Sequence, residues 1–284
     1  MIRNGPAGSN QSHSLATDAR LANAPLLGAD PVDNLNQIAD AHAKLYIEPV
    51  GIVRTDNRDE ALPLAGGPLA FTAARLWVRE ARAARAVAFL TAKELHQWSE
   101  DLSRQGDQRP RHILERLTQA RPAFAGLDLS RTSPHLMGVV NVTPDSFSDG
   151  GDFATADAAI AHGKHLMAAG AQIIDVGGES TRPGAEHISV AEELRRVLPV
   201  IEGLSAAGAC VSIDTRHAKV MQAALGAGAH LVNDVTALTG EDECLEIIAR
   251  TKVPVVLMHM LGEPGTMQQD PMYDAAILDI YDYL

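Results

Sequence analysis

Polar residues follow short apolar runs at five places in the second half of the chain. The residues that end these runs are Asn141, Asp175, Asp214, Asn233 and His259. Each run is short and β-branched, as in a parallel strand that is buried on both faces. Because active sites of parallel α/β proteins gather at the carboxyl ends of the strands, these side chains predict a ligand site there.

Each of these positions also has a purely structural interpretation. Either Asp214 or Thr215 could cap the helix that follows. Asn233 belongs to an Asn-Asp pair that is common at turns and helix starts, and Asp175 could hold the next loop through backbone N–H groups. A histidine between two methionines, as at position 259, is more often a core residue than a ligand.

Two glycine-containing loops favour the ligand interpretation. The first reads NVTPDSFSDGG (residues 141–151) and the second reads GGESTRPG (residues 177–184). Glycines admit close backbone approach, hydroxyls supply donors, and Arg182 offers a planar fork for a carboxylate or phosphate. Two such loops on one rim, with carboxylate and amide side chains between them, predict an anionic or heteroaromatic ligand.

The elements that would position these residues alternate regularly from about Leu136. A Gly-Ala pair ends a helical run and begins an apolar run three times, at Gly170, Gly208 and Gly228. A helix is expected after Ser189, with Glu192 completing a capping box. Its buried stripe is predicted at i, i+3, i+4 and i+7, which are Leu194, Val197, Leu198 and Ile201. Strands alternating with helices predict a parallel sheet of the α/β class. About five βα units fit, which makes a partial (β/α)₈ barrel.

The chain divides into three parts. Residues 1–43 are polar and are expected to be disordered, with a short helix near Asp33–Ala43. Residues 44–130 predict a small α+β extension, and residues 134–284 the barrel domain. The extension is expected to contain strands at 45–53 and 76–89, with a hairpin around 82–85, and helices at 92–104 and 112–121.

Composition excludes several functional classes. The formal net charge of −12 argues against a broad nucleic-acid or membrane surface, and the aromatic content of 4% argues against base-stacking platforms. The first 20 residues resemble neither a signal peptide nor an anchor, and no apolar run approaches the roughly 18 residues that span a bilayer, so we expect a soluble protein. Two cysteines without a C-x-x-C spacing predict reduced thiols in a soluble, cytoplasmic protein and indicate no zinc site.

The two loops and three later motifs resemble the dihydropteroate synthase family. The later motifs are SIDT (residues 212–215), NDV (233–235) and LMHM (257–260), and the resemblance covers residues 136–284. It implies a (β/α)₈ barrel that joins 6-hydroxymethyl-7,8-dihydropterin diphosphate to 4-aminobenzoate, giving 7,8-dihydropteroate and diphosphate for folate synthesis. It also implies small-molecule substrates and allows a homodimer.

The resemblance assigns roles to particular residues. Asp214 would accept paired N–H donors from the pterin, Asn233 would bind the mixed remaining edge, and Met258 would pack on the ring plane. Asn141 would coordinate Mg²⁺ through its amide oxygen. No residue is assigned as a general acid or base.

The remaining assignments fall on the two loops. Thr181 and Arg182 match positions that contact the diphosphate and aminobenzoate sides, and Asp145 would help to order the first loop. The aminobenzoate pocket, which is also the sulfonamide site of the family, would be shaped by Phe147, Ser180 and Pro183.

The family also takes residues from strands six to eight, which match nothing before Leu284. We therefore expect a C-terminally truncated and inactive chain with exposed apolar helix faces and an unpaired edge strand. Two alternatives stay open. One is a non-catalytic pterin-binding relic, and the other is a pterin-dependent methyltransferase domain, which would not need the two loops.

Overall fold

The computed structural model describes residues 43–55, 60–80, 83–143, 152–180 and 187–284. The expected disorder and short helix of residues 1–42 lie outside this part. The chain forms two compact units. One comprises the described residues of Met1–Gly51 and Thr72–Ile113, and the other those of Ile52–Phe71 and Leu114–Leu284.

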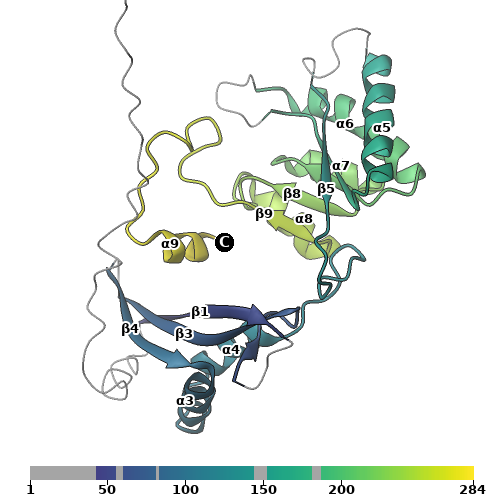
Figure 1. The fold of residues 1–284 in the computed structure, drawn as a ribbon. Helices are drawn as coiled ribbons and strands as arrows, with labels where there is room; N and C mark the ends of the chain where they lie inside the picture. The colour runs from purple at the N-terminus through teal and green to yellow at the C-terminus, as the bar shows by residue number, and fades with distance from the viewer. Residues whose placement is uncertain (1–42, 56–59, 81–82, 144–151, 181–186) are drawn as a thin grey trace, which may run out of the picture. The chain divides into compact units, whose positions relative to one another are not determined.

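The first half of the chain forms a four-stranded sheet (Figure 1). Its strands are β1 (Lys44–Arg54), β2 (Leu62–Pro63), β3 (Leu69–Glu80) and β4 (Ala83–Thr91). Strand β3 has β1 and β2 as neighbours and also pairs antiparallel with β4. The predicted hairpin is therefore confirmed, although β4 already begins at Ala83, slightly before the predicted position.

Two helices follow this sheet. Helix α3 (Ala92–Arg104) has the predicted bounds, because Thr91 and Glu94 form a capping box at its start. Helix α4 (Arg109–Thr118) begins three residues before the predicted His112. Pro110 lies in the first turn of this helix, where proline is tolerated. The Asp107 carboxylate accepts a hydrogen bond from the backbone N–H of Arg109.

A parallel five-stranded sheet forms the framework of the second half, in the order β5-β6-β7-β8-β9. Its strands are β5 (Met137–Asn141), β6 (Ile173–Gly177), β7 (Val211–Asp214), β8 (Leu231–Asp234) and β9 (Val255–Leu257). The helices are α5 (Asp152–Ala168), α6 (Val190–Ala206), α7 (Ala218–Gly226), α8 (Asp242–Thr251) and α9 (Ala276–Tyr283). This confirms the predicted α/β class with five strands.

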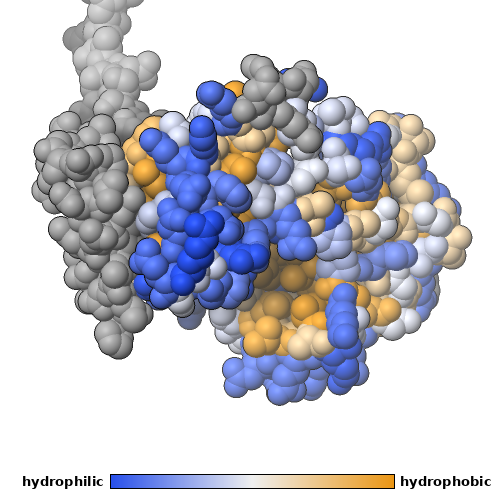
Figure 2. Space-filling model, turned by 90° about the horizontal axis from the view of Figure 1, so that it is seen from below, coloured by the Kyte–Doolittle hydropathy of each residue, from blue (hydrophilic) through white to orange (hydrophobic). Residues whose placement is uncertain are grey.

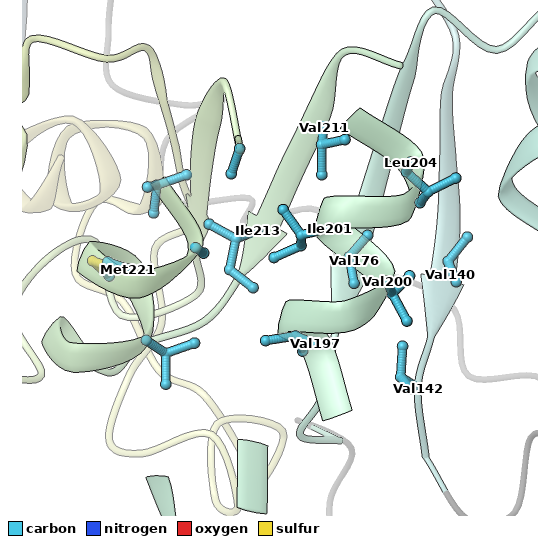
Figure 3. Close-up of a cluster of buried hydrophobic side chains, with 14 of the residues drawn as sticks. Val140, Val142, Val176, Val197, Val200, Ile201, Leu204, Val211, Ile213 and Met221 are labelled. Carbon is cyan, nitrogen blue, oxygen red and sulfur yellow. The ribbon is translucent and has the colours of Figure 1, made fainter. Parts of the chain in front are cut away.

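The hydrophobic core of the second half of the chain lies between the parallel sheet and helices α5 to α8. Figure 3 shows Val197, Val200, Ile201 and Leu204 on α6 among the side chains of the neighbouring strands. Of the four residues in the predicted stripe, Val197 and Ile201 are buried, whereas Leu194 and Leu198 are only half-buried. Glu193 is buried as well, so a glutamate occupies one core position of the helix.

Ser189 caps α6 as predicted, since its hydroxyl accepts from the Glu192 N–H at 3.2 Å. The Glu192 carboxylate does not complete the capping box as its residue type predicted. It accepts hydrogen bonds from Arg195 and Arg196 on the same helix instead. Two nearby guanidinium donors thus displace the backbone N–H as its partner.

The two faces of the sheet differ in chemistry because strand residues alternate between them. Val140, Ile174, Val176, Val211 and Ile213 belong to the core beside the helices. The intervening positions point to the other face, and they include most of the polar residues singled out in the sequence. This face is incompletely covered, since Val139 on β5 is 52% exposed.

The prediction of strands buried on both faces holds for β6, whose five residues are all buried, and is wrong for β5. Among the described strands, β5 and β9 each pair with a single neighbour, as expected for the edges of an open sheet. Figure 2 shows hydrophobic residues reaching the molecular surface between hydrophilic ones. Within the described residues, no helix is both long enough and apolar enough to cross a membrane.

Candidate functional site

The strand register places four sequence-predicted positions in one row across the sheet. Asn141 lies opposite Gly177, Gly177 opposite Asp214, and Asp214 opposite Asn233. A Cβ atom at Gly177 would lie 3.4 Å from Asp214 Oδ2 and 3.7 Å from Asn141 Oδ1. The glycine therefore leaves a space on the polar face that a carboxylate oxygen and an amide oxygen approach together.

Residues other than Asp214 supply the side-chain acceptors at the start of α7. Thr215 Oγ1 accepts from the His217 N–H at 3.2 Å, and Glu241 Oε2 accepts from the Ala218 N–H at 3.0 Å. These two residues supply the capping bonds at the start of α7. The Asp214 carboxylate is thereby left available for a ligand.

The surroundings of Asp214 raise its pKa to about 7. Burial is the largest cause, followed by repulsion from four carboxylates, those of Asp175, Glu193, Asp234 and Glu179. A ligand that presents N–H donors to this carboxylate would stabilise its ionised form and lower the pKa again. Such a perturbed acid facing an open sheet surface is typical of a binding or catalytic position.

Asp175 has a different role from the one first considered. Strand β6 continues to Gly177, so Asp175 lies two residues before its end and is only 4% exposed. Its Oδ2 accepts from the Asn233 side-chain amide at 3.0 Å rather than from backbone N–H groups of the next loop. Its pKa is raised by burial, against the opposing effect of the Ser212 and Asn233 side chains.

Asn233 and Asp234, at the end of β8, have different surroundings. Asp234 is fully buried and accepts from the Thr236 N–H and hydroxyl and from the Leu238 N–H, so it fixes the loop after the strand. Asn233 lies in the row with Asp214. The structural interpretation therefore applies to Asp234, and Asn233 stays a candidate site residue.

The other predicted residues are partly described. Met258 follows β9 and is half-buried, and its backbone N–H donates to the Asp234 carbonyl. His259 is half-buried rather than a core residue, and its Nε2 lies 3.0 Å from the Tyr273 hydroxyl. Ser180 is half-buried after β6. Five predicted residues lie outside the described part of the chain, namely Asp145, Phe147, Thr181, Arg182 and Pro183.

Comparison with known proteins identifies the family. Residues 137–284, which carry the whole parallel sheet, match the family described as pterin binding enzyme. The chain belongs to the pterin-binding enzyme family.

Relatives of this pterin-binding chain carry the name dihydropteroate synthase. The protein of that name from Escherichia coli K12 is 47% identical over 159 residues, which cover 56% of each chain. The one from Synechocystis is 50% identical over 135 residues, or 47% of each chain. The chain thus spans about half the length of the curated relatives that it matches.

A solved structure shows the same fold. The dihydropteroate synthase of Yersinia pestis, determined in a complex with a sulfonamide drug, aligns with a TM-score of 0.51 at 47% identity. The alignment covers 57% of this chain and 59% of that one. The five βα units of the pterin-binding chain therefore correspond to part of a synthase barrel.

A second polar group near the site was missed in the sequence. It comprises Glu179 after β6, Glu193 on α6, and Arg216, His217 and Glu241 at the start of α7 and α8. These residues are far apart in the chain and form no motif. A helical projection gives one signal, because Glu193 lies four residues before Val197 on the buried stripe.

Proposed function

We propose that this chain carries the pterin-binding part of a dihydropteroate synthase. The reaction would join 6-hydroxymethyl-7,8-dihydropterin diphosphate to 4-aminobenzoate and release diphosphate. The observation that carries this proposal is the row in which Asp214 lies between Gly177 and Asn233 with its carboxylate free of a capping role. Family membership and the names of the relatives support it.

The pterin would be recognised by its hydrogen-bonding edge. Ionised Asp214 accepts two adjacent N–H donors, and Asn233 offers both a donor and an acceptor for the rest of the edge. The hydrogen bond from the Asn233 amide to Asp175 fixes which way this amide faces. Met258 would pack against the ring plane.

Mg²⁺ would be held by the amide oxygen of Asn141 together with the substrate diphosphate. The residues fit a hard cation, because this oxygen approaches the same space as the Asp214 carboxylate above Gly177. When bound, the ion would neutralise the charge that develops on the leaving diphosphate.

The chemical step would be a displacement at the pterin methylene carbon. The amine nitrogen of 4-aminobenzoate forms a bond to this carbon while the bond to the diphosphate oxygen breaks, so catalysis consists mainly of positioning and charge stabilisation. Thr181 and Arg182 would contact the diphosphate and aminobenzoate sides, and Asp145 would order the first loop. The aminobenzoate pocket would be formed by Phe147, Ser180 and Pro183.

The setting of this activity would be the cytoplasm. Cys210 and Cys244 are both free thiols, which supports a reducing compartment. A homodimer stays a prediction from the family resemblance.

Titration of the purified chain with a non-hydrolysable pterin diphosphate analogue tests this function. We expect binding that strengthens when Mg²⁺ is added, and binding of 4-aminobenzoate that a sulfonamide displaces once the analogue is present. Formation of dihydropteroate from the natural substrates would then show that the chain also turns over. Absence of analogue binding, with or without Mg²⁺, would refute the proposal.

A further inference from the structure

Three side chains beside the strand ends converge on one point. Glu179, Glu193 and His217 each offer a ligand atom, and these atoms all lie within 4.8 Å of one another. They come from the segment after β6, from α6 and from the N-cap of α7. Three separate elements therefore fix the group, which favours a built arrangement over a chance surface cluster.

The Glu193 carboxylate is buried without a hydrogen-bond partner among the described residues, which favours a bound cation in this group. The residue is 1% exposed, and neither of its carboxylate oxygens has a hydrogen-bond partner among the described residues. The Thr215 hydroxyl is close enough to favour the ionised form, but it does not form a hydrogen bond of ordinary geometry. A buried carboxylate without partners is costly, and a bound cation would relieve that cost.

Gly178 makes room for this carboxylate. A Cβ atom there would lie 2.7 Å from Val197 Cγ1 and 3.1 Å from Glu193 Cγ. Any larger residue would push against the stem of the glutamate. The sequence thus combines a glycine and a glutamate so that the carboxylate reaches the group from a core position.

His217 is oriented as metal-binding histidines are. Its Nδ1 lies 2.7 Å from Glu241 Oε1, and its Nε2 lies 3.7 Å from Glu179 Oε2. Hydrogen bonding of Nδ1–H to Glu241 leaves the lone pair on Nε2, the nitrogen that lies near the Glu179 carboxylate. A carboxylate behind a ligating histidine is the usual outer partner at a metal site.

We propose that Glu179, Glu193 and His217 form a binding site for a divalent transition-metal cation, separate from the Mg²⁺ site proposed at Asn141. One imidazole nitrogen and two carboxylates suit Zn²⁺ or Co²⁺ better than Mg²⁺, which prefers oxygen ligands alone. The site is proposed from this geometry and does not depend on the synthase activity.

Arg216 sets a limit on this site. Its Nε lies 3.1 Å from Glu179 Oε2 and its Nη2 lies 3.3 Å from Glu179 Oε1. The Nδ1 atom of the exposed His187 also lies 3.1 Å from Glu179 Oε1. The guanidinium holds the Glu179 carboxylate in place but also opposes a second cation nearby. Glu193 and His217 are therefore the dominant ligands, and Glu179 completes the site.

The test is titration of the full chain, stripped of metals with a chelator that is then removed, with Co²⁺ followed by absorbance and with Zn²⁺ followed by calorimetry. We expect one equivalent of each metal and a rise in Tm with Zn²⁺. Glu193→Gln and His217→Ala should each lower the affinity at least tenfold, and Glu241→Gln about 10- to 100-fold. The control His162→Ala, on the exposed surface of α5, should bind like the wild type.

Failure of the wild type to bind either metal would overturn the proposal. So would equal affinity and stoichiometry in the wild type, Glu193→Gln and His217→Ala, because the metal would then bind elsewhere. Glu193→Gln is expected to fold, since it removes a buried charge without changing the side-chain volume, and circular dichroism checks this. If Glu193→Gln does not fold, the metal affinity of the half-buried His217→Ala variant is compared with that of the wild type instead.

Discussion

Replacing Asp214 by asparagine should stabilise the protein while weakening its proposed ligand recognition. The carboxylate lies among other acids on the polar face of the sheet, and its pKa is raised to about 7. Asparagine has nearly the same shape and carries no charge. A residue retained for binding at the expense of stability behaves in this way.

The size and direction of the effect follow from the pKa. The folded state holds the proton more tightly than the unfolded state, so wild-type stability falls as the pH rises from 3.8, the ordinary value, to about 7. This difference corresponds to about 4 kcal/mol at 1.36 kcal/mol per pH unit. Because Asp214 is only half-buried, solvent screening reduces the expected effect to roughly 2 kcal/mol.

Urea unfolding of the wild type and Asp214→Asn at pH 5, 6, 7 and 8 measures this quantity. The stability advantage of the variant should grow with pH and level off above pH 7. Asp157→Asn, which removes a carboxylate from the exposed surface of α5, serves as the control and should show no such growth. An advantage that does not change with pH, or a variant less stable than the wild type at pH 8, would refute the reasoning.

Three further substitutions separate binding from stability. Gly177→Ala places a methyl group 3.4 Å from Asp214 Oδ2, which is an ordinary contact. The free energy of unfolding should therefore change by less than about 1 kcal/mol, while calorimetry should show weaker pterin binding. Unchanged pterin affinity would show that the pterin does not bind above Gly177. Asn233→Ala leaves the buried Asp175 carboxylate without its amide donor, so the free energy of unfolding in urea should fall by about 1–3 kcal/mol. An unchanged free energy of unfolding would show that this hydrogen bond does not stabilise the fold. Leu204→Ala, at a fully buried position of α6, should cost about 2–5 kcal/mol and lower Tm; a smaller loss would mean that the core closes around the space.

Local signals in the sequence predicted local structure well. The bounds of α3 and the Ser189 cap of α6 agree with the prediction, because the capping bonds at both helix starts join residues only three positions apart. Alternation of helical and β-branched runs likewise predicted the parallel sheet and its five strands.

Register between strands was harder to predict, because it depends on partners far away in the chain. The polar residue of β6 was expected at the strand end, yet Gly177 occupies that position and Asp175 lies deeper. The amide of Asn233 then reaches Asp175 across the intervening strand. Only the folded sheet brings these two residues together.

The burial of Glu193 was not predicted, for a different reason. Hydrophobic patterning assigns charged residues to the solvent side of a helix, and it therefore favoured Leu194 and Leu198 for the buried face. The structure buries Glu193 with Val197 instead. Core positions that carry a charge follow from the chemistry of a site rather than from the pattern.

Calorimetric titration with a dihydropterin at pH 6, in buffers of different ionisation enthalpy, measures whether Asp214 binds the pterin as a carboxylate. If Asp214 binds the pterin as a carboxylate, binding should release up to one proton, since the ligand lowers a pKa of about 7. Asp214→Asn should bind about 100-fold more weakly, because two charge-assisted hydrogen bonds of about 1.5 kcal/mol each are lost. Pterin binding without proton release, and with equal affinity in the wild type and Asp214→Asn, would contradict the account.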